Sequence, residues 1–116
     1  MTKTARVYGG SLYDLAADEK LDGQIMEQMI AVRQIFRENP GYLKLLGEPA
    51  IPEDERLKMI EEAFGGQAER YLVNFLKLLC ERKILREFAG CCEEFIRRYN
   101  LSLIHISEPT RRVVIS

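Results

Sequence analysis

The chain has 116 residues, of which 47% are hydrophobic and 30% are charged, and this balance is typical of one folded domain. The formal net charge of −1 argues against a nucleic-acid-binding protein, because such proteins usually carry clustered Lys and Arg. No apolar stretch is long enough for a transmembrane helix, and the first residues lack the apolar segment of a signal peptide. We therefore expect one soluble intracellular domain with no nucleic-acid partner and no direct membrane insertion.

The apolar residues of the first hundred positions recur at helical spacing, which predicts an all-α fold. The first expected helix covers residues 4–20, with Tyr8 and Leu12 on one face. Gly9 and Gly10 lie inside this helix, and each costs about 1 kcal/mol of helix stability relative to alanine. They indicate either a weak first turn or the close approach of another backbone.

A longer helix is expected over residues 22–39, where the apolar stripe is wide enough to predict burial on two sides. The residues that widen this stripe are Met26, Ile30 and Ile35. Pro40 disfavours a helical conformation for the residue before it, so this helix should end there. A short helix should follow over residues 42–46.

The fourth expected helix begins at Pro52, since proline loses no needed hydrogen bond at a first helical position and the acids that follow suit the helix dipole. The side chains of its predicted buried face are Leu57, Ile60, Ala63 and Phe64. Gly65 and Gly66 should stop the helix by adopting left-handed conformations that other residues resist.

Two further helices complete the expected fold. Residues 71–79 predict a helix that is apolar over most of its circumference, which places it at the centre of a bundle. Residues 84–100 continue the helical period, and Arg97 and Arg98 carry the charge that suits a helix C-terminus. The sequence therefore predicts a bundle of six helices joined by short connections.

Residues 101–116 depart from this pattern, because a loose alternation followed by β-branched residues predicts a lone hairpin. Such a hairpin is marginal in water, and no other segment predicts a sheet that it could join. Leu101 to Arg111 instead resemble the translation of a common transposase-type sequencing adapter, and the last five residues fit its index and following bases. We therefore expect a helical domain at residues 1–100, continued by other sequence in the natural chain, and a non-native tail at residues 101–116.

Few residues offer catalytic or metal-binding chemistry. His105, the only histidine, lies in the expected tail and is therefore excluded from such roles. Cys91 and Cys92 are adjacent, but they have no nearby base and no metal-ligand spacing, which favours a pair of small helical residues. Neighbouring acids on a helix point apart, so a solvated surface is favoured over a cation site. We expect no catalytic residues, no metal and no cofactor.

A candidate interaction surface lies on the first and fifth expected helices, whose aromatic, small and apolar side chains are suited to line a groove for a partner helix. Leu12, Phe75 and Leu79 are expected to face the core at its base. The residues expected at its rim are Tyr8, Ser11, Asn74 and Leu78. The alternative is that all of these side chains face the core. The predicted partner-binding site comprises Tyr8, Ser11, Leu12, Asn74 and Leu78.

Several short strings occur in a fixed order along the chain. They are Ala5-Arg6-Val7-Tyr8, Leu12-Tyr13-Asp14-Leu15-Ala16, Asn39-Pro40, Leu45-Leu46, Pro49-Ala50-Ile51 and Asn74-Phe75-Leu76-Lys77-Leu78-Leu79-Cys80-Glu81-Arg82. In their order and spacing they resemble the N-terminal domain of the delta subunit of bacterial F-type ATP synthase, called the oligomycin-sensitivity-conferring protein in mitochondria. The family usually has alanines at the positions of Gly9, Gly10 and Ser11, and a Gly-Arg pair near Lys83 and Ile84.

The resemblance implies a six-helix bundle on top of the catalytic head, with the N-terminal helix of an alpha subunit between its first and fifth helices. It implies a second domain, outside residues 1–100, that contacts the b subunits of the peripheral stalk. The subunit would then be a non-catalytic part of the stator, peripheral to the cytoplasmic face of the bacterial inner membrane. The complex to which such a subunit belongs couples ATP synthesis to proton transport.

Two other classes remain open on the sequence alone. One is a stand-alone helical adaptor or RNA-binding bundle, although acidic residues slightly outnumber basic ones in residues 1–100. A solvated surface is the expected role of the local basic cluster formed by Arg82, Lys83 and Arg86. The other, more remote, is an enzyme that uses one of the three cysteines, Cys80, Cys91 or Cys92.

Overall fold

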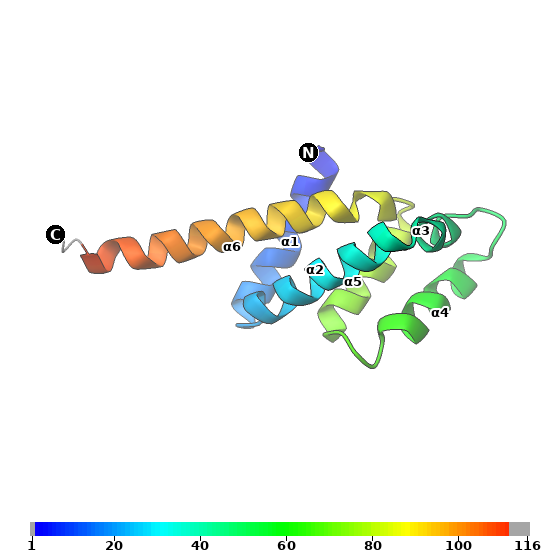
Figure 1. Cartoon of the computed structure of the whole chain (residues 1–116), viewed down its shortest axis with the longest axis horizontal. Helices are drawn as coiled ribbons and strands as arrows, with labels where there is room; N and C mark the ends of the chain where they lie inside the picture. The colour runs from blue at the N-terminus through cyan, green and yellow to red at the C-terminus, as the bar shows by residue number, and fades with distance from the viewer. Residues whose placement is uncertain (1, 112–116) are drawn as a thin grey trace.

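The computed structural model describes residues 2–111, with side-chain surroundings up to Ser102, and this part of the chain is helical without a strand (Figure 1). Its elements are α1 (Lys3–Asp18), α2 (Asp22–Glu38), α3 (Pro40–Leu46), α4 (Glu53–Phe64), α5 (Arg70–Glu81), the short 3₁₀ helix η1 (Leu85–Glu87) and α6 (Phe88–Arg111). The all-α class and the six-helix bundle are therefore confirmed. The short helix α3 begins two residues earlier than expected, because Pro40 itself occupies a first helical position.

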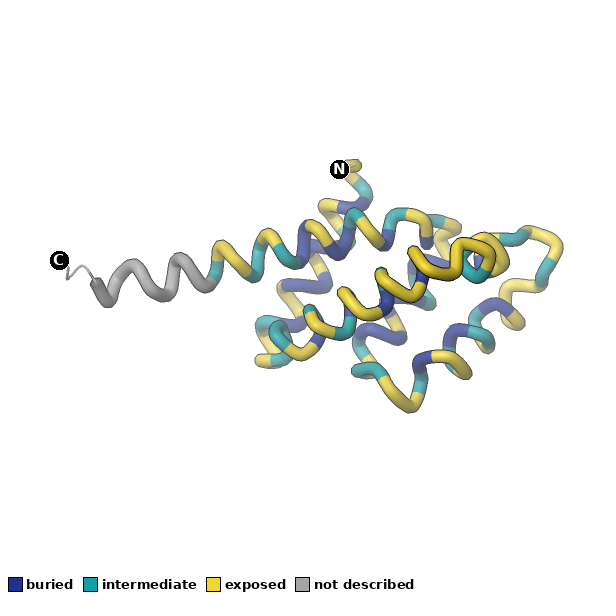
Figure 2. The backbone as a smooth tube through the Cα atoms, in the orientation of Figure 1, coloured by how far each residue is buried: buried dark blue, intermediate teal, exposed yellow. Residues whose placement is uncertain are grey.

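The helices bury one side each against a shared core. Helix α6 packs along both α1 and α2, and α4 packs against α5. Figure 2 shows that the buried positions follow the inward sides of these helices, and that solvent-facing positions are exposed. Phe36 of α2 joins the parts of the core, since its ring meets those of Phe88 and Phe64 edge to face at centroid distances of 5.7 and 6.4 Å.

The glycines of α1 mark a close contact with α6. A methyl group added at Gly9 would lie 2.5 Å from the carbonyl oxygen of Cys91 and 2.9 Å from its Cα. The backbone of α6 thus occupies the space that a side chain would need. Of the two interpretations that the sequence left open for Gly9, close approach of another backbone is confirmed.

Three local expectations are wrong. Helix α2 is buried on one side only, because Ile30 and Ile35 remain 39% exposed where no other helix covers them. Ala63 of α4 is exposed as well. Gly65 ends α4 with a φ of −58°, and no described glycine has a positive φ, so left-handed glycine is not what stops the helix.

The last helix extends beyond residue 100. Helix α6 continues through residues 101–111, so this segment does not form the hairpin that the sequence already disfavoured, and adding residues to an existing helix avoids the cost of nucleation. Figure 1 shows this part of α6 extending past the other helices. Arg97 and Arg98 consequently lie inside the helix and not at its C-terminus. The boundary after Asn100 and the adapter origin of the tail stay predictions, and residues 112–116 lie outside the described part.

Candidate partner-binding groove

Helix α1 supplies the first wall of a groove. Tyr8, Ser11, Leu12 and Leu15 follow one another at steps of three, one and three residues, so they form a single stripe along the helix. Leu12 is only 4% exposed and forms part of the floor, whereas Ser11 is exposed and Tyr8 is half-buried. Gly9 lies between them and faces α6 instead. The contact at Gly9 therefore fixes which side of α1 is left open.

Helix α5 supplies the opposite wall in the same way. Tyr71, Asn74, Phe75 and Leu78 recur at helical spacing along it, and they face the stripe of α1 across a depression of about 320 Å³. Phe75 is 7% exposed and lies at the floor, Asn74 is exposed, and Tyr71 and Leu78 are half-buried. None of the eight lining residues carries a formal charge. We call this depression the α1–α5 groove.

The structure brings all five predicted site residues together around the α1–α5 groove. They are Tyr8, Ser11, Leu12, Asn74 and Leu78. The expected division into floor and rim also agrees, with Leu12 and Phe75 buried and the others more accessible. Leu79 is fully buried behind the groove and does not line it. Binding of a partner by these residues stays a prediction.

Two lining residues, Leu15 and Tyr71, were not expected at the site. Both were detectable from the helical period, since Leu15 follows Ser11 and Tyr71 precedes Phe75 by one turn. Leu15 is 39% exposed, a large value for an apolar side chain. Its exposure extends the apolar surface of the groove toward the C-terminus of α1.

A cluster of ion pairs lies on α6 and reaches the helix that carries the first wall. Glu94 of α6 is 1% exposed and accepts hydrogen bonds from the guanidinium groups of Arg97 and Arg98, at 2.7 and 2.6 Å. The guanidinium of Arg98 also lies 3.6 Å from the Asp14 carboxylate of α1. These hydrogen bonds, from Arg97 first, lower the pKa of Glu94 to about 2 although its burial acts in the opposite direction.

A second ion-pair cluster joins α4 to the helix that carries the other wall. Arg70 donates two hydrogen bonds to the Glu61 carboxylate at 2.8 and 3.0 Å, and Lys77 donates one at 2.6 Å. The hydrogen bonds from Arg70 and then Lys77 lower the pKa of Glu61 to about 2. Because Glu61 and Arg70 are accessible to solvent, this cluster positions α4 more than it stabilises the fold.

The cysteines are unsuited to nucleophilic chemistry, because they are buried. All three cysteines are buried and unpaired, and burial raises the pKa of the Cys91 thiol to about 12, the opposite of what a reactive thiolate needs. No group of His, Cys, Asp and Glu within the described residues is arranged to hold a metal ion. Among the helices described, none combines the length and the apolar character that crossing a membrane requires.

The fold is a small helical bundle with an open, uncharged groove between α1 and α5. The family model of the ATP synthase delta (OSCP) subunit matches residues 4–106. The chain therefore belongs to the ATP synthase delta (OSCP) subunit family.

Curated relatives carry the same family name. The chain is 26% identical to ATP synthase subunit delta of Lachnoclostridium phytofermentans, 27% to that of Bacillus subtilis and 32% to that of a Geobacillus species. These alignments cover 95%, 82% and 83% of this chain, and 66%, 52% and 53% of the relatives. The chain thus spans between about half and two thirds of the length of these relatives.

Proposed function

We propose that this chain is a non-catalytic stator component of an F-type ATP synthase and that its α1–α5 groove receives the N-terminal helix of an alpha subunit. Family membership supports a place in the complex, and the groove supports the mode of binding. In this role the bundle holds the catalytic head still while the central shaft turns. The complex would carry it peripherally, at the cytoplasmic face of a bacterial inner membrane.

The observation that carries this proposal is the pair of facing, uncharged stripes on α1 and α5. A helix that lies between them would present apolar anchors at spacings of three, four and seven residues. A stator must hold its partner tightly, and nanomolar affinity corresponds to about 12 kcal/mol of binding free energy. Burial of apolar side chains supplies such energy more readily than exposed ion pairs, each of which contributes at most about 1 kcal/mol.

The connection to the stalk is assigned to another part of the subunit. In the family that the chain resembles, a second domain contacts the b subunits, and the matched relatives extend well beyond the aligned segment. The segment described here is therefore proposed to bind alpha without linking it to the stalk. It should not restore coupled ATP synthesis to a bacterial strain that lacks delta, and full restoration would contradict this division of labour.

Titration calorimetry with a peptide from an alpha-subunit N-terminus tests the groove. Leu78→Asp should weaken binding about a hundredfold, because it places a carboxylate against the apolar side chains of the bound helix. Tyr8→Ala should weaken it about tenfold by removing an aromatic anchor. The matched control is Leu45→Asp, which makes the same change at a leucine of α3 that is 42% exposed and does not line the groove.

All variants should retain the helical circular dichroism and the cooperative unfolding of the unmodified chain, since none of the three positions is fully buried. Unchanged affinity in both Leu78→Asp and Tyr8→Ala would exclude the α1–α5 groove as the binding surface. Equal loss in the Leu45→Asp control would have the same consequence, because the effect would then not depend on the groove.

A further inference from the structure

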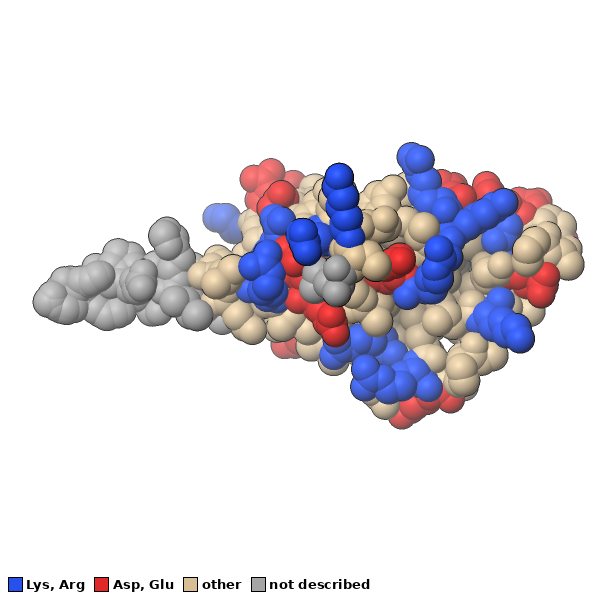
Figure 3. All heavy atoms as spheres, turned by 90° about the horizontal axis from the view of Figure 1, so that it is seen from above, with Lys and Arg blue, Asp and Glu red and all other residues tan. Residues whose placement is uncertain are grey.

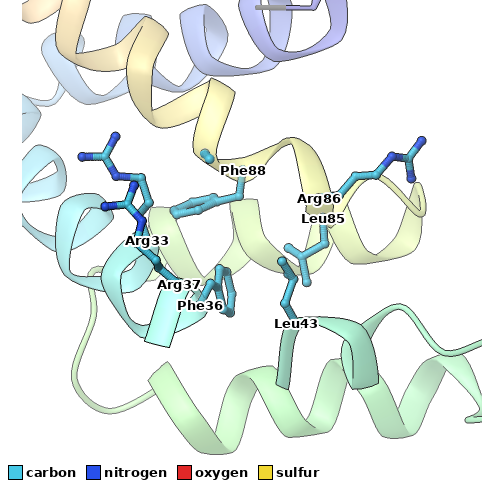
Figure 4. A pocket seen from close by; sticks show the side chains of 8 residues that line it. Arg33, Phe36, Arg37, Leu43, Leu85, Arg86 and Phe88 are labelled. Carbon is cyan, nitrogen blue, oxygen red and sulfur yellow. The ribbon is translucent and has the colours of Figure 1, made fainter. Parts of the chain in front are cut away.

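A second depression lies where α2, α3 and η1 meet the start of α6. Its volume is about 230 Å³, and its floor is formed by Phe36, Leu43, Leu85 and Phe88. Figure 4 shows these four side chains pointing toward one another around the cavity, with Arg33 and Arg37 on one side and Arg86 on the other. The floor is thus apolar and aromatic, whereas the rim is cationic.

A neighbouring depression of about 360 Å³ extends this surface along α3. It shares Leu43, Leu85 and Arg86 with the first depression, and Lys44 and Lys83 add two more cations to its border. No Asp or Glu among the described residues lines either depression. We call the two together the cationic hollow; its rim consists of Arg33, Arg37, Lys44, Lys83 and Arg86.

Within the residues that the structure describes, none of the five rim cations forms an ion pair with a carboxylate, and the same holds for other basic residues such as Lys20, Lys58 and Arg82. Arg70, Lys77, Arg97 and Arg98 all form ion pairs with Glu or Asp. Arg86 donates a hydrogen bond to the backbone carbonyl of Lys83 at 3.0 Å. Figure 3 shows basic side chains over both halves of the face that it draws, with acidic side chains between them.

The position of Lys83 adds to this observation. Its φ is 61°, a left-handed conformation that costs an L-residue roughly 1 kcal/mol and that glycine adopts freely. The turn closes α5, with the amide of Ile84 donating to the carbonyl of Leu79 at 2.9 Å. A lysine at this turn therefore places a cation at the rim in spite of an unfavourable backbone conformation.

We propose that the cationic hollow binds an acidic segment of a partner protein that inserts an apolar side chain between Phe36 and Leu85. Charge complementarity argues for the acidic character, since five cations border the hollow and none of its described lining residues is acidic. The apolar floor argues for the inserted side chain, and the spread of cations over several elements argues for an extended segment. This site is separate from the α1–α5 groove and does not depend on it.

Fluorescence anisotropy with a short labelled peptide tests the proposal. The probe carries one Phe and one Leu between Glu residues, and its control peptide has Gln in place of every Glu. Arg33→Glu and Arg86→Glu, made separately, should each weaken binding of the acidic probe about tenfold by reversing a charge at the interface. The matched control is Lys58→Glu, because Lys58 is exposed on α4 and lines neither depression.

The outcomes separate the possible occupants. Tighter binding of the Glu peptide than of the Gln peptide, lost in both rim variants and kept in Lys58→Glu, supports the proposal. Equal loss in Lys58→Glu would overturn it in favour of non-specific attraction. Binding to vesicles of phosphatidylserine and phosphatidylcholine without binding of the acidic probe would overturn it in favour of a lipid surface. Leu78→Asp should leave binding of the acidic probe unchanged, so this test and that of the groove fail independently.

Discussion

The α1–α5 groove and the cationic hollow are both open depressions with apolar floors, but their borders differ. Eight uncharged residues line the groove, whereas five cations surround the hollow. The groove is built from two stripes at helical spacing, and the hollow is assembled from short pieces of several elements. A floor of apolar side chains therefore provides affinity in both places, and the border determines which partner each can accept.

The largest expected effect is that of a substitution in α1, which should affect the groove and leave the hollow unchanged. Gly9→Ala should lower the free energy of unfolding by about 2 kcal/mol, since the added methyl group would meet the backbone of Cys91 and overpacking costs about 1–3 kcal/mol. It should also weaken binding of the alpha peptide, because α1 would shift away from α6 and would move the groove wall that it carries. Binding of the acidic probe should stay constant, since α1 does not line the hollow.

Gly10→Ala is the control for this variant. The atoms nearest to its added methyl group belong to the guanidinium end of Arg98, which can move aside. The better helix propensity of alanine, about 1 kcal/mol, then offsets most of the cost. Urea unfolding followed by circular dichroism measures both variants. Equal destabilisation at the two positions would show that backbone contact with α6 is not what requires glycine.

Salt should weaken binding at the hollow more than binding at the groove. Raising the salt concentration from about 0.1 M to about 1 M shortens the Debye length from about 10 Å to about 3 Å and should weaken binding of the acidic probe about tenfold. Binding of the alpha peptide should change much less, because no charged residue lines the groove. Anisotropy and calorimetry at several salt concentrations provide the comparison, and equal salt dependence of both ligands would argue against the difference between their borders.

Acid should weaken the ion-pair cluster of α6. The pKa of Glu94 is about 2 in the folded chain, below its ordinary value of 4.5, so its contribution to stability is present above pH 4.5 and is lost as the pH falls toward 2. Glu94→Gln should remove about 1 kcal/mol of this pH-dependent stability. The control is Glu93→Gln at the exposed neighbouring position. Urea unfolding between pH 6 and pH 2 measures the difference, and identical pH profiles for Glu94→Gln and the unmodified chain would refute it.

The smallest expected effect concerns the two lysines with left-handed backbones. Lys83→Gly and Lys20→Gly should each raise the free energy of unfolding by about 0.5 kcal/mol, because glycine adopts a positive φ without strain. Only Lys83→Gly should also weaken binding of the acidic probe, by about twofold, since it alone removes a rim cation. An equal loss of probe binding in Lys20→Gly would exclude a role for Lys83.

The groove was predictable and the hollow was not, for a physical reason. Helical spacing alone places Tyr8 beside Leu12 and Asn74 beside Leu78, so the sequence predicts both stripes and needs only the packing of α1 with α5 to complete the site. The rim of the hollow comes from α2, α3, η1 and the turn after α5. No period along the sequence connects Arg33 with Lys83, and the basic cluster near Arg86 was expected to be a solvated surface.

The other departures also arise from tertiary contacts. Arg97 and Arg98 match a helix C-terminus by charge, but the burial of Glu94 gives them partners inside α6. Helix α2 was expected to be buried on two sides because apolar residues such as Ile35 widen its stripe, yet no other helix covers that side. Local pattern thus predicts which residues share a face, whereas the neighbouring elements decide whether that face is covered.

The central claim is that the α1–α5 groove is the surface that binds a partner helix. The most direct test is the nuclear magnetic resonance spectrum of the ¹⁵N-labelled chain during titration with the alpha-subunit N-terminal peptide. Amide shifts should concentrate in α1 around Ser11 and in α5 around Asn74, and those of Arg37 and Lys44 should stay in place. Shifts that concentrate around Arg37 and Lys44, with α1 and α5 unchanged, would contradict the account.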